Sequence, residues 1–389
     1  MFKQSLSYLS STFLVVIINF LTLPYFTQYL SLSDYGILAL FILFGNIVTS
    51  LASIGLHQAA YRFYFKYEVH VFQIINTSIV FFIIAIFSII GFLVVLPLSE
   101  KLSHAIFNNQ ISPRLLELAF LSGCFHYFYI YFSNLLAAQK LANHVSFLLV
   151  FHSFIVALLT FYFINWQSLT FLAPIYALFS ANVISFILSF LFNIKLFHLS
   201  FSIRRILKAI KFSYPEVPSI LIGLLYSGFD KSMLANYKGA ASVGQYEFGN
   251  RFSIILKHFM DAINRSWIPF FMEGSEKNTQ ESKDAIVERF YSLAFLFGFV
   301  GLIVSAFSEE ALFILTTEEF YKAKYLVPIF VIQILIGVPG YLSVNQIMFA
   351  GKLIYNVPVS IASLATNIIF NLILIPEYGA LGAVISTAI

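Results

Sequence analysis

Charge and cysteine are the two scarce components of this 389-residue sequence. Charged residues make up 10% of it, whereas a soluble domain carries about 25%. Hydrophobic residues make up 60%, and the mean hydropathy is +0.88. These values exclude an ordinary soluble domain and indicate a membrane protein. The single cysteine, Cys124, excludes an internal disulfide and any cysteine-based zinc or iron–sulfur centre.

Catalytic and nucleotide-binding motifs are also missing. The sequence contains no His-Glu-x-x-His, no phosphate-binding loop and no nucleophile elbow. Its net charge of +4 is too small to indicate a nucleic-acid surface. We therefore expect no enzymatic activity, no cofactor, no metal site and no nucleic-acid partner.

Long apolar runs are the main positive feature of the sequence. A membrane-spanning helix needs about 20 predominantly apolar residues, and such runs favour helices over the alternating pattern of a barrel. Eleven spanning helices are predicted, within residues 4–33, 35–61, 71–99, 117–140, 141–194 (two helices, divided near 165–167), 209–229, 243–265, 290–308, 325–351 and 353–376. Residues 378–389 are too few to cross, so we expect a truncated twelfth helix.

The distribution of Lys and Arg predicts the orientation. Thirteen of them fall in segments on the same side as the N-terminus and six on the other side. Since cytoplasmic segments carry the excess of positive charge, we expect a cytoplasmic N-terminus. The first apolar stretch is too long for a cleaved signal peptide.

The two halves of the chain resemble each other weakly. YLSLSDYG at 29–36 corresponds to YKGAASVG at 237–244, and AQKL at 138–141 corresponds to AGKL at 350–353. We therefore predict two six-helix lobes in a parallel pseudo-twofold repeat, which is typical of transporters. Chance alignment of apolar sequence is the alternative. The predicted divisions are an N-terminal lobe at 1–195, a basic cytoplasmic linker at 196–212 and an incomplete C-terminal lobe at 213–389.

The segment 243–265 carries more charge than a lipid-facing helix tolerates, because one central charge costs about 2.5–3.5 kcal/mol on insertion scales. At 100° per residue, an arc of about 80° contains Glu247, Arg251, His258, Asp261 and Arg265. One interpretation is a ladder of ion pairs that holds this helix to a neighbour. We favour the other, a hydrated central cavity in which Lys257 and His258 attract an anion.

Further polar residues are candidates for gating, coupling or lipid contact. Glu216 lies between two prolines that allow a bend, although it could equally be an interfacial loop residue. Asp230 lies near the outer end of the same predicted helix. We treat Glu216, Asp230, Glu247 and Asp261 as coupling or gating candidates. Arg62, at the cytoplasmic end of the second helix, either snorkels to the headgroups or meets a lipid phosphate. The scattered histidines other than His258 are interpreted as packed or interfacial residues.

Four motifs together resemble one family. They are PYFTQYLSLSDYG (24–36), GLHQAAYR (55–62), DKSMLANY (230–237) with VGQY (243–246), and NLILIPEYGALG (371–382). Their order and spacing are similar to those of the Wzx-type polysaccharide flippases of the multidrug/oligosaccharidyl-lipid/polysaccharide exporter superfamily. The abrupt end at Ile389 departs from that pattern.

The resemblance implies a function and a location. Such a protein would sit in the bacterial inner membrane and move an undecaprenyl-diphosphate-linked oligosaccharide from the cytoplasmic to the periplasmic leaflet, for O-antigen or capsule synthesis. Arg251 and Arg265 would then receive the diphosphate or acidic sugars. Membrane lipids and the polysaccharide polymerase machinery would be partners. The alternative is an ion-coupled drug or organic-cation antiporter of the same superfamily, which favours a cavity dominated by acidic groups.

Overall fold

The computed structural model describes residues 2–198, 200–214, 217–350 and 356–389, and the regular structure in these residues is helical throughout. Nine of the described helical segments are long and apolar enough to cross a membrane. Helices satisfy their own backbone polar groups, as a hydrocarbon environment requires. The predicted all-α, multi-pass membrane class is therefore confirmed, and the count of twelve spanning helices stays a prediction.

The chain divides into two compact units, and each is described by itself. Unit 1 comprises Met1–Leu30 and Ile37–Gly228, and unit 2 comprises Ser31–Gly36 and Phe229–Ile389. Two helices, α2 (Leu32–Ser53) and α10 (Val217–Lys238), contribute residues to both units. The basic segment 196–212 belongs to unit 1. The predicted six-plus-six repeat stays a prediction.

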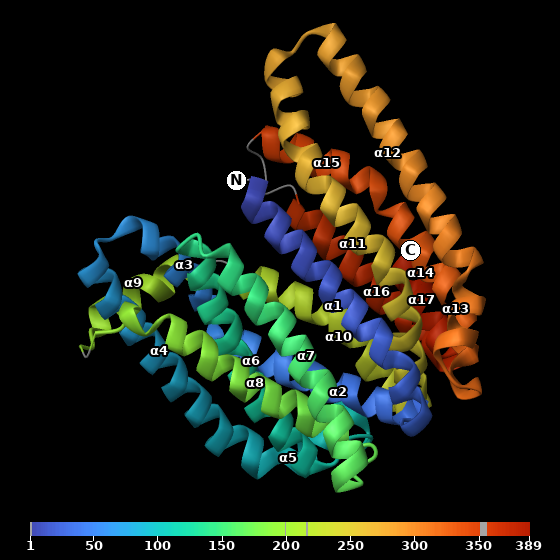
Figure 1. Cartoon of the computed structure of the whole chain (residues 1–389), viewed down its shortest axis with the longest axis horizontal. Helices are drawn as coiled ribbons and strands as arrows, with labels where there is room; N and C mark the ends of the chain where they lie inside the picture. Colours follow the sequence, from blue (N-terminus) through green and yellow to red (C-terminus); the bar gives the residue numbers. More distant parts are fainter. Residues whose placement is uncertain (1, 199, 215–216, 351–355) are drawn as a thin grey trace. The chain divides into compact units, whose positions relative to one another are not determined.

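Unit 1 is a bundle of long helices, with the short helices α3 (Leu56–Lys66) and α9 (Ile203–Ser213) packed together at one end (Figure 1). Besides its parts of α2 and α10 it contains α1 (Phe2–Tyr29), α3 (Leu56–Lys66), α4 (Val69–Ile90), the π-helical η1 (Gly91–Val95), α5 (Leu96–Phe107), α6 (Pro113–Ala138), α7 (Ala142–Gln167), α8 (Ala173–Phe192), the short η2 (Ile194–Leu196) and α9 (Ile203–Ser213). Helix α1 packs against α7, and α6 and α7 both pack against α8. The predicted division near 165–167 agrees with the end of α7 at Gln167.

Two glycines allow α2 and α6 to approach closely. A Cβ added to Gly45 would lie 2.6 Å from the carbonyl oxygen of Ala119, and one added to Gly123 would lie 2.6 Å from the carbonyl oxygen of Gly45. Small residues at such crossings let helix backbones touch, which is a main source of helix association in membranes. The contact fixes the positions of the polar residues that adjoin these glycines, Asn46 on α2 and Ser122 on α6.

The second predicted helix, within 35–61, is broken in the structure. Its predicted C-terminal boundary was therefore wrong. Ile54 has φ 50° and Gly55 has φ 67°, both in the left-handed region. A β-branched residue rarely adopts this conformation, and two consecutive left-handed residues end α2 at Ser53. Arg62 therefore lies on the separate helix α3, where its side chain is exposed. Hydropathy gave no signal for this break, although Gly55 is the residue type that most readily adopts the left-handed conformation after a helix end.

Unit 2 is built around the longest helix of the protein's described residues. It contains α11 (Ala240–Lys277), α12 (Gln280–Ala306), α13 (Ser308–Leu315), the 3-10 helix η4 (Glu318–Tyr325), α14 (Val327–Ile336), α15 (Val338–Phe349), α16 (Asn356–Tyr378) and α17 (Ala380–Ala388). Helix α11 packs against α12, α14 and α17. The predicted helix at 325–351 is divided at Gly337 into α14 and α15.

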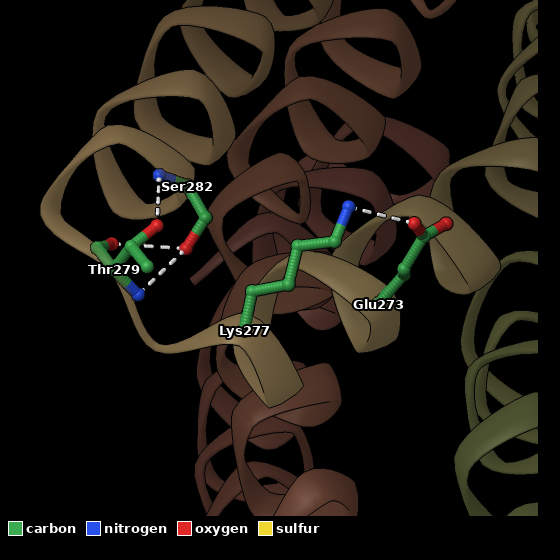
Figure 2. Close-up of polar contacts among 4 residues, drawn as sticks. All are labelled: Glu273, Lys277, Thr279 and Ser282. Carbon is green, nitrogen blue, oxygen red and sulfur yellow. Dashed lines mark hydrogen bonds and ion pairs between the residues drawn. The ribbon is translucent and has the colours of Figure 1, made fainter.

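A tight polar turn joins α11 and α12. Asn278 adopts φ 46° and ends α11. Thr279 then caps α12: its hydroxyl accepts from the Ser282 amide at 3.2 Å, and the Ser282 hydroxyl accepts from the Thr279 amide at 3.2 Å (Figure 2). In the last turn of α11, the Lys277 ammonium donates to Glu273 at 2.8 Å (Figure 2). That bond lowers the pKa of Glu273 and raises the pKa of Lys277.

The first turn of α2 packs on the first turns of α11 inside unit 2. A Cβ added to Gly36 would lie 1.8 Å from the carbonyl oxygen of Ala240, and one added to Gly244 would lie 1.8 Å from the carbonyl oxygen of Leu32. Gly36 and Gly244 are also the corresponding residues of the sequence repeat. Glu319 of η4 accepts from the Leu32 amide at 2.9 Å and so satisfies a free donor at the start of α2.

Candidate functional site

An extensive polar cluster in the described part of unit 2 surrounds the Asp230 carboxylate of α10, which is 1% exposed. The hydroxyl of Tyr246 donates to its Oδ2 at 3.1 Å, and the hydroxyl of Thr387 donates to the same oxygen at 2.8 Å. The amide of Asn371 donates to Oδ1. Four helices, α10, α11, α16 and α17, thus supply side chains to one buried carboxylate.

The cluster contains more oxygen acceptors than donors to fill them. Asn367 accepts from the Asn371 amide at 3.0 Å and donates to Thr387 at 3.3 Å. The Oδ1 atom of Asn371 is buried and has no hydrogen-bond partner among the described residues. A buried acceptor without a partner costs about 1–3 kcal/mol unless a bound group satisfies it. Within the described ranges, no basic side chain lies within 4.0 Å of the Asp230 carboxylate.

Local sequence explains how α16 and α17 present these groups. Asn367 and Asn371 are four residues apart and therefore share one face of α16. Gly379, with φ 59°, reverses the chain after α16. A Cβ on Gly382 would lie 2.3 Å from the carbonyl oxygen of Leu374, so only glycine lets α17 fold back this closely. The reversal brings Thr387 to the asparagines.

The charged face predicted at 243–265 contacts residues of two other helices. Glu247 forms an ion pair with Lys231 of α10, at 2.6 Å. The Arg251 guanidinium lies 5.6 Å from the ring centroid of Tyr35, which comes from the first turn of α2. This cation–π contact places the half-buried Arg251 guanidinium against an uncharged aromatic ring.

The other predicted site residues lie apart from the Asp230 cluster. Lys257 and His258 are exposed on α11, and Asp261 is half-buried with a partner of its own. Glu216 and the side chain of Arg265 lie outside the described residues. Arg62 belongs to unit 1. Of the coupling candidates, the structure joins Asp230 to a polar network and Glu247 to Lys231, and the hydrated cavity stays a prediction.

A second polar cluster, in unit 1, contains residues that the sequence analysis did not select. His126 of α6 and His152 of α7 both contact the side-chain oxygen of Asn182 of α8, at 3.2 and 2.9 Å. Asn182 in turn donates to the hydroxyl of Ser122 at 2.9 Å. His126 and Asn182 line a pocket of about 210 Å³. Single histidines in apolar runs gave no signal for this convergence, because His126 and His152 are 56 and 30 residues from Asn182 and only the packing of three successive helices brings them together.

Comparisons with known proteins connect these helices to polysaccharide synthesis. The family model described as polysaccharide biosynthesis protein matches residues 1–275. A relative from Haloferax volcanii, described as a probable low-salt glycan biosynthesis flippase, Agl15, is 28% identical over 46% of this chain. The match spans only 38% of that relative's length.

Two solved structures share the fold over almost the entire chain. The lipid II flippase MurJ, in an inward closed conformation, gives a TM-score of 0.78 over 100% of this chain and 84% of its own, at 13% identity. An inward-facing multidrug resistance MATE family transporter gives a TM-score of 0.76 over 96% of this chain and 90% of its own, also at 13% identity. At this identity the likeness shows the fold alone, so it does not separate a flippase from a drug transporter.

Proposed function

Because the chain belongs to the polysaccharide biosynthesis protein family, we propose that it is a flippase for a lipid-linked oligosaccharide in the synthesis of surface polysaccharide. The observation that carries the proposal is the family match over residues 1–275, a region that contains six of the nine candidate membrane spans. A relative named as a glycan biosynthesis flippase supports it. The family and its transporter-like neighbours favour a transport protein over a catalyst.

Flipping requires that a polar head crosses the hydrocarbon while the lipid tail stays in it. Alternating access achieves this when the substrate binds differently to two arrangements of the protein. We propose that Arg251 and Arg265 receive the undecaprenyl diphosphate or acidic sugars. The contact of Arg251 with Tyr35 supports this role, since it positions the guanidinium without neutralising it. Planar guanidinium groups match phosphate geometry.

We further propose that Asp230 couples transport to a proton or a monovalent cation. A buried carboxylate without a basic partner favours uptake of a positive charge, because an unpaired buried charge is costly. The vacant acceptor of Asn371 and the hydroxyl of Thr387 supply further oxygens beside it. Binding there biases the protein only if the cluster differs between its two states.

The proposed location is the bacterial inner membrane, with the N-terminus in the cytoplasm. Helix α9 of the predicted linker supports this orientation, because its exposed residues include Arg204, Lys208 and Lys211. Short connecting segments rich in Lys and Arg lie on the cytoplasmic side of membrane proteins. The polysaccharide polymerase is proposed as a partner, which co-purification from the native membrane would test.

The test of the function is complementation of a host that lacks its own flippase. The wild-type chain should restore surface polysaccharide, and Arg251→Ala or Arg265→Ala should abolish it while membrane insertion is unchanged. Arg289→Ala is the matched control: this exposed arginine of α12 also lies on an aromatic ring, Phe270, at 4.9 Å. Normal export by both test variants would refute the assigned roles.

The antiporter alternative predicts a different result in the same cells. It requires efflux of an organic cation, which collapses when Asp230 or Asp261 is neutralised, and no effect on surface polysaccharide. The flippase requires that lipid-linked oligosaccharide accumulates in the cytoplasmic leaflet when Asp230→Asn is expressed. Measuring efflux and leaflet accumulation together distinguishes the two functions.

A further inference from the structure

The cluster of His126, His152 and Asn182 lies deep in unit 1. His126 is the fourteenth of the 26 residues of α6, and Asn182 is the tenth of the 20 residues of α8. In helices that span the membrane, these positions lie near the centre of the hydrocarbon. Polar and ionisable residues at that depth are costly and mark binding sites or pathways. Neither the proposed phosphate-binding residues nor the Asp230 cluster includes them.

Hydrogen bonding fixes the orientation of the Asn182 amide. Its Nδ2 atom lies 2.9 Å from the Ser122 hydroxyl and 3.4 Å from the Ser122 carbonyl oxygen. A carbonyl oxygen can only accept, so the nitrogen must face Ser122 and Oδ1 must face the two imidazoles. The amide oxygen is likewise only an acceptor. Both imidazole nitrogens that contact it, Nδ1 of His126 and Nε2 of His152, must therefore carry a proton.

This arrangement leaves one nitrogen of the His126 ring, Nε2, able to accept a hydrogen bond. In the neutral ring the second nitrogen, Nε2, is an acceptor. No hydrogen-bond partner is present for Nε2 among the described residues, whereas Nδ1 is held by Asn182. His152 does not line the pocket; it stacks on Tyr129, with ring centroids 5.2 Å apart and planes 8° apart. Together, Asn182 and the stacked His152 hold His126 in one tautomer beside the pocket.

The pocket combines this acceptor with an exposed amide and an apolar wall. Asn46 of α2 supplies the amide, and Phe41, Ile42 and Leu178 supply most of the wall. None of the residues that line it in the described part of unit 1 is Asp, Glu, Lys or Arg. Its volume of about 210 Å³ is below the 300–1,000 Å³ of pockets for drug-sized ligands. The pocket therefore suits one small, neutral ring with hydroxyl groups.

We propose that this pocket binds one sugar ring, whose hydroxyl donates to Nε2 of His126 while its C–H surface lies against Phe41 and Leu178. Asn46 contacts a second hydroxyl. The identification of the sugar as part of a transported glycan rests on the proposed function. The binding of a sugar rests only on the geometry of unit 1.

The test uses the purified full-length chain in lipid nanodiscs, labelled with ¹⁵N-histidine. Methyl glycosides of glucose, galactose, mannose and N-acetylglucosamine are titrated one at a time. At least one should shift the Nε2 resonance of His126 saturably, and His126→Gln assigns that resonance. Leu178→Trp fills the pocket without touching the hydrogen bonds of Asn182, and should weaken binding by about tenfold or more. Leu191→Trp, at an exposed position of the same helix, is the control and should leave binding unchanged.

Each result decides the proposal. No shift with any of the four sugars overturns it, and so does an equal response in Leu178→Trp. Export in the complementation assay separates the two proposals. A chain that binds sugar but supports no export refutes the flippase and leaves the pocket standing. Normal export by Leu178→Trp, despite lost binding, overturns the assignment of the sugar to the transported glycan.

Discussion

The contact between Gly36 and the start of α11 makes the sharpest stability prediction. In Gly36→Ala, the new Cβ would lie 1.8 Å from the Ala240 carbonyl oxygen, whereas real Cβ contacts are at least 3.0 Å, so the backbones must separate by about 1.2 Å. A backbone oxygen cannot rotate away as a side chain can. Overpacking typically costs 1–3 kcal/mol, and we expect about 3 kcal/mol here because both sides are backbone. Gly244→Ala should cost a similar amount, since its Cβ would meet the Leu32 carbonyl at the same distance.

The assay follows unfolding of unit 2 in detergent through a single tryptophan. Trp267 is 4% exposed, and the chain has only one other tryptophan, Trp166, so a Trp166→Phe background makes Trp267 the sole reporter. Gly298→Ala is the matched control in α12: its Cβ would have no neighbour within 4 Å, and alanine should stabilise the helix by about 0.5–1 kcal/mol. Wild-type stability in both Gly36→Ala and Gly244→Ala would refute the reasoning.

Three further predictions concern polar contacts. Thr279→Ala removes the capping box of α12 and should destabilise the α11–α12 turn by about 1 kcal/mol, which hydrogen exchange of the Ser282 amide would detect as faster exchange. On the acid side, the Glu273–Lys277 pair stabilises the last turn of α11 above the ordinary Glu pKa of 4.5, and this stabilisation is lost as the pH falls through the lowered pKa of Glu273. On the basic side, the stabilisation is present below the ordinary Lys pKa of 10.5 and is lost as the pH rises through the raised pKa of Lys277. Protection of the last turn of α11, measured against the exchange of an unstructured peptide at the same pH, should therefore fall at both extremes in the wild type and fall less in Glu273→Gln. Helix α9 exposes the apolar residues Ile203 and Leu207 beside basic residues, as interfacial helices do. Changing Arg204, Lys208 and Lys211 together to Gln should therefore reduce the amount of phosphatidylglycerol that the purified protein retains, measured by native mass spectrometry. Equal retention would contradict an interfacial role.

Composition and apolar runs predicted the fold class, because the hydrocarbon permits few structures and requires long helices. The same runs did not predict the breaks. The left-handed residues Ile54 and Gly55 interrupt a run of uncharged residues, and the division of 325–351 at Gly337 lies in an equally apolar context. When both sides of a break are hydrophobic, the change in hydropathy that normally marks a helix end is absent, and a glycine at each break is the remaining signal.

The candidate sites depended on contacts that no local pattern contains. Asp230 was selected as a charged residue in a helix, but its partner Asn371 is 141 residues away. Arg251 was selected for its place on a charged face, and its neighbour Tyr35 comes from α2. His126 and His152 were interpreted as packed residues, because one sequence does not show that α8 supplies an amide between them. Residue type indicated the kind of chemistry, and tertiary packing determined which side chains share it.

The turn at Asn278–Thr279 is also a suitable position for inserting an epitope. At 1.5 Å per residue, the 38 residues of α11 measure about 57 Å, nearly twice the 30 Å hydrocarbon thickness. We therefore expect the polar C-terminal end of α11, where Glu276 and Lys277 are exposed, to extend beyond the hydrocarbon, and the packing of Trp267 and Phe271 against Ile286 of α12 supports this extension. We expect a small epitope inserted after Asn278 to be displayed at the end of this extension, where antibody-based imaging would determine which face of the membrane it reaches.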